Sequence, residues 1–461
     1  MAEHVQDNAE REEDDYGLDP RLVQSIREAI DAGNAPAIDT LMAPLHAADI
    51  ADVLEQIDPD ERRDLVRLWS KGFDGDILSE LDEAIREDVI EALPHEVLTE
   101  AVRELDSDDV VDLIEDLEEP VQERILDALE VSDRVAVEQS LTYPEYSAGR
   151  LMQREVVTAP EYWTVGEAID FLRNAKELPD QFYHVILVDP RWHPVGYVTL
   201  GKLLSSKRAV KLTEITEDSF RTIGVMDEEG DVAYAFNQYH LISAPVVDED
   251  GRLAGVITID DAMAVLDEEH EEDILRLAGV GEESSVSDGV LDVVRQRLPW
   301  LVVNLFTASL SAIVISQFTG TIARIVALAA LMPIVASTGG IAGTQALAVA
   351  VRALATRDLT SSNAARVVRR EIAAGLLNGL SLALVLGIGG ALIFASPLIG
   401  LVLGLAMVVN QIVACLGGVT VPLVLHRIGL DPALASGTFV TTLTDVMGFL
   451  AFLGLATMIL T

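Results

Sequence analysis

The chain has 461 residues and a formal net charge of −44, with 76 Asp and Glu against 32 Lys and Arg. This length exceeds one ordinary core, so we expect at least two or three structural units. The charge argues against a nucleic-acid partner, because binding phosphates requires Lys and Arg to displace counterions. The single cysteine, Cys415, lies in an apolar stretch and excludes a disulfide framework.

The acids are concentrated in the first two thirds of the chain. Residues 1–300 hold 72 of the 76 acids, whereas residues 301–461 hold 4 acids and 7 bases. Two explanations compete for this excess: cation-binding sites, or a solvated surface adapted to a very salty cytoplasm. We favour salt adaptation for most of the acids. An acidic run in this part of the chain therefore does not by itself indicate a metal site.

The N-terminal part reads as helical. Residues 1–17 lack the basic and apolar regions of a signal peptide, and we predict a disordered acidic tail there. Over residues 18–140 the pattern is helical and repeats at a shift of 60 residues: "HAADIADVLEQIDPDERRDLVRLW" (46–69) aligns with "DSDDVVDLIEDLEEPVQERILDAL" (106–129). Such self-similarity predicts an all-α domain built from helical repeats.

A second duplication follows, in which strands alternate with helices. "VDPRWHPVGYVTLGKLL" (188–204) aligns at an offset of 59 with "VDEDGRLAGVITIDDAM" (247–263), and each copy reads as strand, turn, strand and helix. We place the copies at residues 141–206 and 207–268. A unit of about 60 residues is small for independent stability, so the two α+β copies are expected to pack together.

The last part reads as a membrane domain. Residues 269–297 form a predicted amphipathic connecting helix, and residues 298–461 hold five apolar spans, at about 298–318, 325–351, 372–394, 398–425 and 433–460. Each is long enough to cross the hydrocarbon core. Arginines gather before the first span, between the second and third, and between the fourth and fifth, while only Arg324 lies on the other side. The positive-inside rule then predicts a multi-pass plasma-membrane protein with its N-terminus in the cytoplasm and its C-terminus outside.

The fifth span contains one acid, Asp445, near its middle. A lone Asp at mid-membrane costs roughly 2.5–3.5 kcal/mol, and such residues normally face a polar cavity or a partner. No other span carries Lys or Arg at comparable depth, so the remaining partners are water, a proton or a cation. The alternative is a protonated Asp that hydrogen-bonds between packed helices. Helical spacing places Thr438, Thr441, Thr442 and Asp445 on one face, which favours a lined path.

The second span contains "STGGIAGTQALAV" (337–349), with glycines at 339, 340 and 343. Glycines allow close backbone approach or a local helix break, although ordinary helix packing explains them equally well when they are taken alone. Carboxylate, carbonyl and hydroxyl oxygens suit magnesium or calcium. One Asp cannot strip a divalent ion of its water, so copies around a symmetry axis would be needed. We therefore expect a homodimer with a pore near its two-fold axis.

At this point the motifs are similar to those of a known family. "GGIAGTQALAVAVRALATRDL", "RREIAAGLLNGL" and "RIGLDPALASGTFVTTLTDVMGF" closely resemble the membrane domain of MgtE-type magnesium channels. The order of parts is also similar: an acidic helical N domain, paired CBS domains, a connecting helix and five spans. The chain departs from the family pattern twice, with Ile341 in place of an Asn and Thr438 in place of a Pro.

The resemblance implies roles for particular residues of the membrane domain. Asp445 would hold a hydrated magnesium ion in the pore, and Asp431 would lie at the cytoplasmic mouth. The 14 residues between them span about 21 Å of helix, which suits one acid at depth and one at the rim. The pore-lining residues would be Gly340, Gly343, Thr441 and Gly448.

The resemblance also implies regulation by cytosolic magnesium, which would screen acids that otherwise repel one another and so close the channel. The matching acids are Asp108, Asp112, Asp227, Glu229, Glu268, Glu271 and Glu272. Each cluster is equally consistent with an ordinary solvated surface. CBS pairs often bind adenine nucleotides such as ATP, and the second copy has the matching Gly255, Thr258 and Asp261, whereas the first has Lys202 in place of the acid.

The leading hypothesis is a passive, magnesium-gated divalent-cation channel. No phosphate-binding loop and no nucleophile–base pair appears in the sequence, so we expect no enzymatic activity. One alternative is a cation/proton exchanger in which Asp445 cycles a proton. Another is a membrane-anchored sensor of ions or nucleotides without transport, which would have no need of Asp445.

Overall fold

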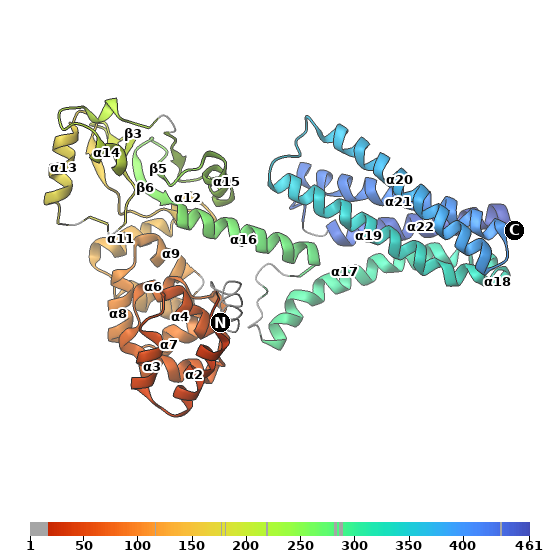
Figure 1. Cartoon of the computed structure of the whole chain (residues 1–461), viewed down its shortest axis with the longest axis horizontal. Helices are drawn as coiled ribbons and strands as arrows, with labels where there is room; N and C mark the ends of the chain where they lie inside the picture. The colour runs from red at the N-terminus through yellow and green to blue at the C-terminus, as the bar shows by residue number, and fades with distance from the viewer. Residues whose placement is uncertain are drawn as a thin grey trace, which may run out of the picture. The chain divides into compact units, whose positions relative to one another are not determined.

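The computed structural model describes residues 17–461 except 116, 177, 180, 218–219, 281–283, 285–288 and 434–435. Residues 1–269 form one compact unit and residues 270–461 a second (Figure 1). The acidic tail predicted at residues 1–17 lies outside the described residues apart from Gly17.

The N-terminal part of the first unit is built entirely from short helices. They are α2 Pro20–Asp31, α3 Ala35–Met42, α4 Ala47–Gln56, α5 Pro59–Trp69, η1 Ser70–Gly72, α6 Gly75–Ser79, α7 Glu83–Ala92, α8 His95–Glu104, α9 Ser107–Glu115, α10 Glu119–Leu126 and α11 Val131–Ser140. Polar side chains start several of them: Asp19 accepts from the backbone N–H of Arg21 at 2.8 Å, and Asp82 accepts from that of Ala84 at 2.8 Å. Part of the acid excess is thus used in helix capping.

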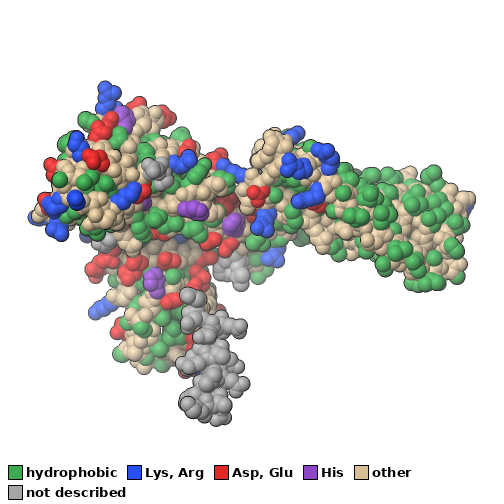
Figure 2. Space-filling view, turned by 45° about the horizontal axis from the view of Figure 1, so that its top comes forward, with side chains coloured by type: hydrophobic (Ala, Val, Ile, Leu, Met, Phe, Trp, Pro, Cys, Tyr) green, Lys and Arg blue, Asp and Glu red, His purple; other side chains and the backbone are tan. Residues whose placement is uncertain are grey.

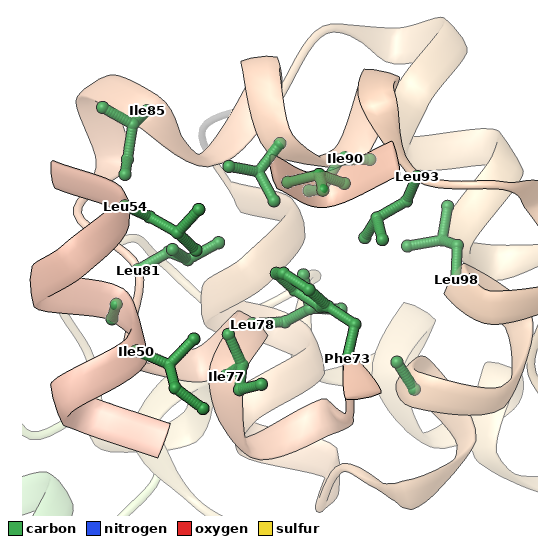
Figure 3. Close-up of a cluster of buried hydrophobic side chains, with 14 of the residues drawn as sticks. Ile50, Leu54, Phe73, Ile77, Leu78, Leu81, Ile85, Ile90, Leu93 and Leu98 are labelled. Atoms are coloured by element: carbon green, nitrogen blue, oxygen red, sulfur yellow. The ribbon is translucent and has the colours of Figure 1, made fainter. Parts of the chain in front are cut away.

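A single apolar core holds these helices together. Figure 3 shows Leu54, Leu78, Ile90 and Leu98 turned toward one another from four helices, and each is almost completely buried. The repeat predicted at a shift of 60 residues is confirmed in its register: α4 and α9 begin at residues 47 and 107, and α5 and α10 at residues 59 and 119. The helical-repeat prediction was therefore correct.

The second part of the first unit contains two small sheets. Its elements are α12 Ala148–Leu151, β1 Thr158–Pro160, α13 Val165–Asn174, β2 His184–Val188, β3 Pro194–Thr199, α14 Leu200–Ser205, η2 Leu212–Glu214, β4 Ile223–Gly224, α15 Glu229–Tyr239, β5 Ser243–Val247 and β6 Leu253–Thr258. The orders are β1-β2-β3 and β4-β5-β6, each with one parallel and one antiparallel pairing. Residue 184 pairs with 199 in the first sheet, and residue 243 pairs with 258 in the second. Both positions are thus shifted by the predicted 59 residues.

The two α+β copies share a core, as predicted. Ile186, Val188 and Tyr197 of the first copy pack with Leu253 and Val256 of the second. A backbone bridge joins Gln153 to Val256, and the His184 and Ser243 side chains, at equivalent positions of the two copies, contact each other. Each copy contributes residues to this buried cluster, so separating the copies would expose apolar side chains of both.

The segment predicted as a connecting helix, residues 269–297, contains parts of two helices. Helix α16 spans Ile259–Ala278, and α17 spans Val290–Ser316. Residues 269–278 therefore continue the helix that follows β6, while residues 290–297 belong to the same helix as the first membrane span. Helix α17 continues through Pro299.

Five helices of the second unit are long and apolar enough to cross a membrane, in agreement with the sequence. They are α17, α19 Ala327–Ala355, α20 Ala364–Ile393, α21 Pro397–Arg427 and α22 Ser436–Leu460, with the short α18 Thr319–Arg324 between the first two. Glycines let α20 and α21 approach closely: a Cβ on Gly400 would lie 2.2 Å from the carbonyl oxygen of Gly387. Hydrophobic side chains cover much of the outer surface of this bundle in Figure 2.

Candidate functional site

Asp445 lies in the tenth position of α22, inside the apolar bundle. Its side chain is partly buried, and among the described residues no hydrogen bond or ion pair engages its carboxylate. A charged carboxylate without a protein partner at this depth requires water, a proton or a cation. Asp445 is thus the chemically unusual group of the bundle.

The threonines that precede Asp445 present oxygen lone pairs. Thr441 Oγ1 donates to the carbonyl oxygen of Gly437 at 2.6 Å, Thr442 Oγ1 donates to that of Thr438 at 2.6 Å, and Thr444 Oγ1 donates to that of Thr441 at 2.8 Å. A hydroxyl whose hydrogen is committed to the helix backbone can still accept. Thr441 and Thr442 are partly exposed, whereas Thr444 is fully buried. The first two can therefore accept hydrogen bonds from water around a cation.

The glycines of α19 fall into two groups. A Cβ on Gly339 would lie 2.2 Å from Asn410 Nδ2, and one on Gly343 would lie 2.6 Å from Val440 Cγ1. By contrast, a Cβ on Gly340 would meet Thr441 Cγ2 only at 3.7 Å. Helix α19 is continuous through these residues. Gly339 and Gly343 therefore allow close helix packing, while Gly340 lies beside the threonine face of α22.

Gly448, expected to line the pore, is buried in the same packing. A Cβ there would lie 3.0 Å from the amide of Asn410. Asn410 on α21 is fully buried, and its Nδ2 donates to the carbonyl oxygen of Val335 at 2.8 Å. This amide, which sequence reasoning missed, joins three helices one turn from Asp445. A polar residue in the middle of an apolar span was the available signal.

A second missed feature is a polar stripe on α19. Ser337, Thr344 and Gln345 are exposed in the single chain, and Ile341, at the position where the resemblance predicted Asn, is 56% exposed. These residues recur at intervals of four and seven or eight, which places them along one side of the helix. Lipid tails cannot satisfy amide and hydroxyl groups, so this side is suited to a protein or aqueous neighbour.

Asp431 lies just before α22 and is engaged by Arg276 of α16. Arg276 Nη1 donates to Asp431 Oδ2 at 2.6 Å, and Arg276 Nη2 donates to Glu272 Oε2 at 2.8 Å. The structure thus brings together one acid expected at the pore mouth and one expected to bind regulatory metal. A guanidinium lies between them.

In the first unit, four acids come together where α9 meets the start of α16. Asp108 is only 7% exposed, and its pKa is raised well above its usual value by burial and then by the negative charge of Asp261. Burial and the same Asp261 charge raise the pKa of Asp109 to about 7. Burial, with a further contribution from Asp260, raises the pKa of Asp261 to about 6. Proton or cation binding would relieve this repulsion.

The contact of α9 with the α+β pair has its own polar anchors. Glu155 Oε2 accepts from Ser107 Oγ at 2.8 Å, and Arg150 pairs with Glu115. Of the other predicted regulatory acids, Asp112 pairs with the buried Arg86 at 2.9 Å, and Asp227 accepts from the Gly224 N–H at 2.8 Å. Glu229 lies on α15, and Glu268 and Glu271 lie on α16. Among the described residues, no group of three or more His, Cys, Asp or Glu is arranged to hold a metal ion.

The predicted nucleotide residues are already engaged within the protein. Asp261 Oδ2 accepts from Thr258 Oγ1 at 2.6 Å and from its backbone N–H at 3.2 Å, and Gly255 packs against residues 152 and 153. The cavity lined by Tyr183, His184 and Thr258 has a volume of only about 20 Å³. A larger groove of about 510 Å³ lies between β4 and α15, where Arg221 stacks on Tyr239.

In the first copy, Lys202 occupies the position equivalent to Asp261 and forms an ion pair with Glu217 at 3.0 Å.

In the part of the chain that the structure describes, these features are those of a multidomain membrane protein: five helices long and apolar enough to span a membrane, one of them with an acid that has no partner there, joined to an acidic helical domain and a duplicated α+β module. Models of known families match three parts of this chain. A divalent cation transporter model (MgtE) matches residues 332–455, an MgtE intracellular N domain matches 45–146, and CBS domains match 148–208 and 220–268.

The protein belongs to the MgtE family of divalent cation transporters. It is 32% identical over 448 residues to the magnesium transporter MgtE of Thermus thermophilus, covering 96% of this chain and 99% of that protein. It is 34% identical over 322 residues to the magnesium transporter MgtE of Enterococcus faecalis, covering 70% and 71% of the two chains. Among solved structures, the ATP complex of the cytosolic domain of the Mg²⁺ channel MgtE aligns with a TM-score of 0.49 and 28% identity, covering 53% of this chain and 99% of that one.

Proposed function

We propose that this protein imports magnesium ions passively across the cell membrane, through a path that passes Asp445. The observation that carries the proposal is a carboxylate inside an apolar bundle with no protein partner among the described residues, one turn from threonine oxygens that can accept. Magnesium dehydrates reluctantly and is commonly held through its waters, whose hydrogens suit such acceptors. Close relatives named as magnesium transporters support this choice of ion.

The polar stripe of α19 supports a homodimer. One carboxylate per chain is a weak ligand set for a divalent ion, whereas two copies around a two-fold axis supply two. Ser337, Thr344 and Gln345 would then face the partner copy or the water-filled path rather than lipid. Helix α17 is also mostly uncovered within the single chain, which leaves an apolar surface for a second copy or lipid.

We propose that the N-terminal unit is cytoplasmic and the C-terminus outside. Figure 2 shows Lys and Arg side chains gathered at one end of the membrane bundle. Arginines 352, 366, 369 and 370 lie around the connection from α19 to α20, whereas Arg324 is the last residue of α18, before the connection to α19. This asymmetry matches the positive-inside rule.

For regulation, we propose that cytosolic magnesium acts where Asp108 and Asp109 approach Asp261, and that these acids, which are not arranged to hold a metal ion in this structure, move together when it binds. The three acids repel one another in a poorly solvated setting, and a divalent ion would neutralise that repulsion. Binding there would hold α9 against the CBS pair. Loss of magnesium would loosen this contact, and such a change could be passed to the membrane helices.

We further propose that an adenine nucleotide binds the second CBS copy through Gly255, Thr258 and Asp261. The G-x-x-T-x-x-D pattern supports it, and Lys202 argues against the equivalent place in the first copy. Because Asp261 is near Asp108 and the adjacent cavity is small, nucleotide binding would require this region to open.

A flux assay in proteoliposomes tests the transport proposal. Magnesium entry should persist when the proton gradient is collapsed, and it should be lost in Asp445→Ala. Asp358→Ala removes an exposed acid of the connection after α19 and serves as the matched control. Flux that requires a proton gradient would instead support a cation/proton exchanger, and an absence of flux at every magnesium concentration would support a sensor.

A further inference from the structure

Arg276 bridges two carboxylates within the second unit. It lies in the last turn of α16 and reaches Asp431 at 2.6 Å through Nη1 and Glu272 at 2.8 Å through Nη2. The three side chains are only 17%, 26% and 31% exposed, respectively. Hydrogen bonds between ionised groups that are partly shielded from water are stronger and less screened by salt than exposed ion pairs.

Apolar contacts place this bridge on the membrane helices. Leu277, the next residue, packs against the cluster formed by Leu347, Val351, Ala433 and Val440. These residues come from α19, from the start of α22 and from the segment before it. The end of α16 is therefore held to the membrane bundle by one apolar side chain and one ionic bridge that are adjacent in sequence.

The orientation of Asp431 is fixed independently of Arg276. Its Oδ1 accepts from the backbone N–H of Ala433 at 2.6 Å, which leaves Oδ2 for the guanidinium. A carboxylate held in this way is pre-oriented, so little side-chain entropy is lost when a cation binds. Together with Glu272 it forms a two-acid site of the kind that a divalent ion could bridge.

We infer that Arg276 is the built-in cation of this site: it holds the end of α16 to the segment before α22 without a metal ion. Two carboxylates this close repel unless a positive charge lies between them. A guanidinium supplies planar, paired donors and does not lose its proton in proteins. Since it is part of the chain, it is present at every magnesium concentration.

The functional consequence rests on the proposed transport function, in which the segment before α22 lies at the mouth of the path. On that basis this contact persists when magnesium falls, and the magnesium response depends on the acids around Asp261 instead. Asp431 and Glu272 then act as positioning residues for α16 rather than as metal ligands.

Amide hydrogen exchange on the full-length protein in detergent tests the inference without requiring transport. In the wild type, exchange in residues 270–278 should be the same with magnesium and with a chelator. In Arg276→Gln without magnesium, exchange there should accelerate on the order of tenfold, because the two acids lose their counter-charge. Adding millimolar magnesium should slow exchange again in the variant, since an ion can now bridge the acids.

Matched variants separate this role from general instability. Arg295→Gln removes a guanidinium that is 81% exposed and only 3.5 Å from Asp292, and it should leave exchange in residues 270–278 unchanged. Arg276→Glu combined with Asp431→Arg should restore slow exchange. The inference is overturned if wild-type exchange depends on magnesium, or if Arg276→Gln exchanges like the wild type. A failed flux assay would contradict the transport proposal, but it would not affect these exchange measurements, because they do not depend on transport.

Discussion

Asn410 shows how much one polar side chain can determine inside an apolar bundle. Its buried amide donates to a carbonyl oxygen of α19 and occupies space that exists only because residues 339 and 448 are glycines. The amide thereby sets the distance between α19, α21 and α22 next to Asp445. Small residues at helix crossings in membranes commonly have this role.

Gly339→Ala tests this packing. The new Cβ would lie 2.2 Å from Asn410 Nδ2, so the amide must move away from the Val335 carbonyl. Overpacking of this kind costs about 1–3 kcal/mol. We expect a lower melting temperature of the purified protein in detergent. Gly389→Ala is the control because no atom lies within 4 Å of its Cβ position, and equal melting temperatures for the two variants would contradict the account.

At the level of residues, the sequence was sufficient to single out Asp445, because an unpaired acid in an apolar span is conspicuous without any structure. The sequence could not show that Gly343 and Gly448 are packed tightly against neighbouring helices whereas Gly340 is not, since only the neighbouring helix determines whether a Cβ has room. Nor could it pair Glu272 with Asp431. Those acids are 159 positions apart in the chain, and nothing in the sequence pattern links either of them to the guanidinium of Arg276 that joins them.

At the level of elements, both duplications were predictable. The spacing of apolar residues can be seen directly in the sequence, and it repeats at shifts of 60 and 59 residues. The connections between helices were harder to predict. Residues 269–297 were predicted as one connecting helix, but residues 290–297 belong to the same helix as the first span, which continues through Pro299. The docking of α9 on the CBS pair could not be predicted, since it depends on contacts such as Ser107 with Glu155 across 48 positions.

That docking should depend on pH. Burial raises the pKa of Asp109 to about 7 and that of Asp261 to about 6, from ordinary values of 3.8. The docked form therefore binds protons more tightly than the undocked or unfolded chain, so its stability is greatest below about pH 4 and falls as pH rises toward 7. Amide exchange in residues 107–115, corrected for the intrinsic rate, should be faster at pH 8 than at pH 5.

Two further conditions sharpen this test. Magnesium at pH 8 should slow exchange in α9, because a divalent ion replaces the lost protons between the acids. Asp261→Asn should weaken both the pH dependence and the magnesium effect, since it removes the charge that acts on Asp108 and Asp109. Exchange in α9 that is the same at both pH values would show that these acids do not control docking.

At the scale of the whole molecule, the chain leaves polar groups uncovered on a membrane helix. We therefore predict a homodimer in which the α19 stripes face each other. In a Cys415→Ala background, a cysteine at Ile341, which is 56% exposed, should cross-link two copies into a covalent dimer. A cysteine at Ile393 of α20, which is 78% exposed, should not. Equal cross-linking at both positions would indicate random collision rather than a specific interface.

The charge distribution divides the chain into one part suited to water and one part suited to lipid. Residues 1–300 hold nearly all the acids, some of which cap helices or pair with arginines, while the second unit offers lipid an apolar surface. Most of the acids therefore do not belong to one binding site, in keeping with a solvated surface. The acids to which we assign functions are the few that are buried or partly buried.

Magnesium flux into proteoliposomes, measured for Asp445→Asn beside Asp358→Asn with the proton gradient collapsed, tests the central claim most directly. Asparagine keeps the shape but removes the charge that holds the hydrated ion. Since hydrogen bonds to a charged group contribute about 1.5–3 kcal/mol, we predict a roughly 10- to 100-fold loss of flux for Asp445→Asn and none for Asp358→Asn. Wild-type flux in Asp445→Asn would contradict the account.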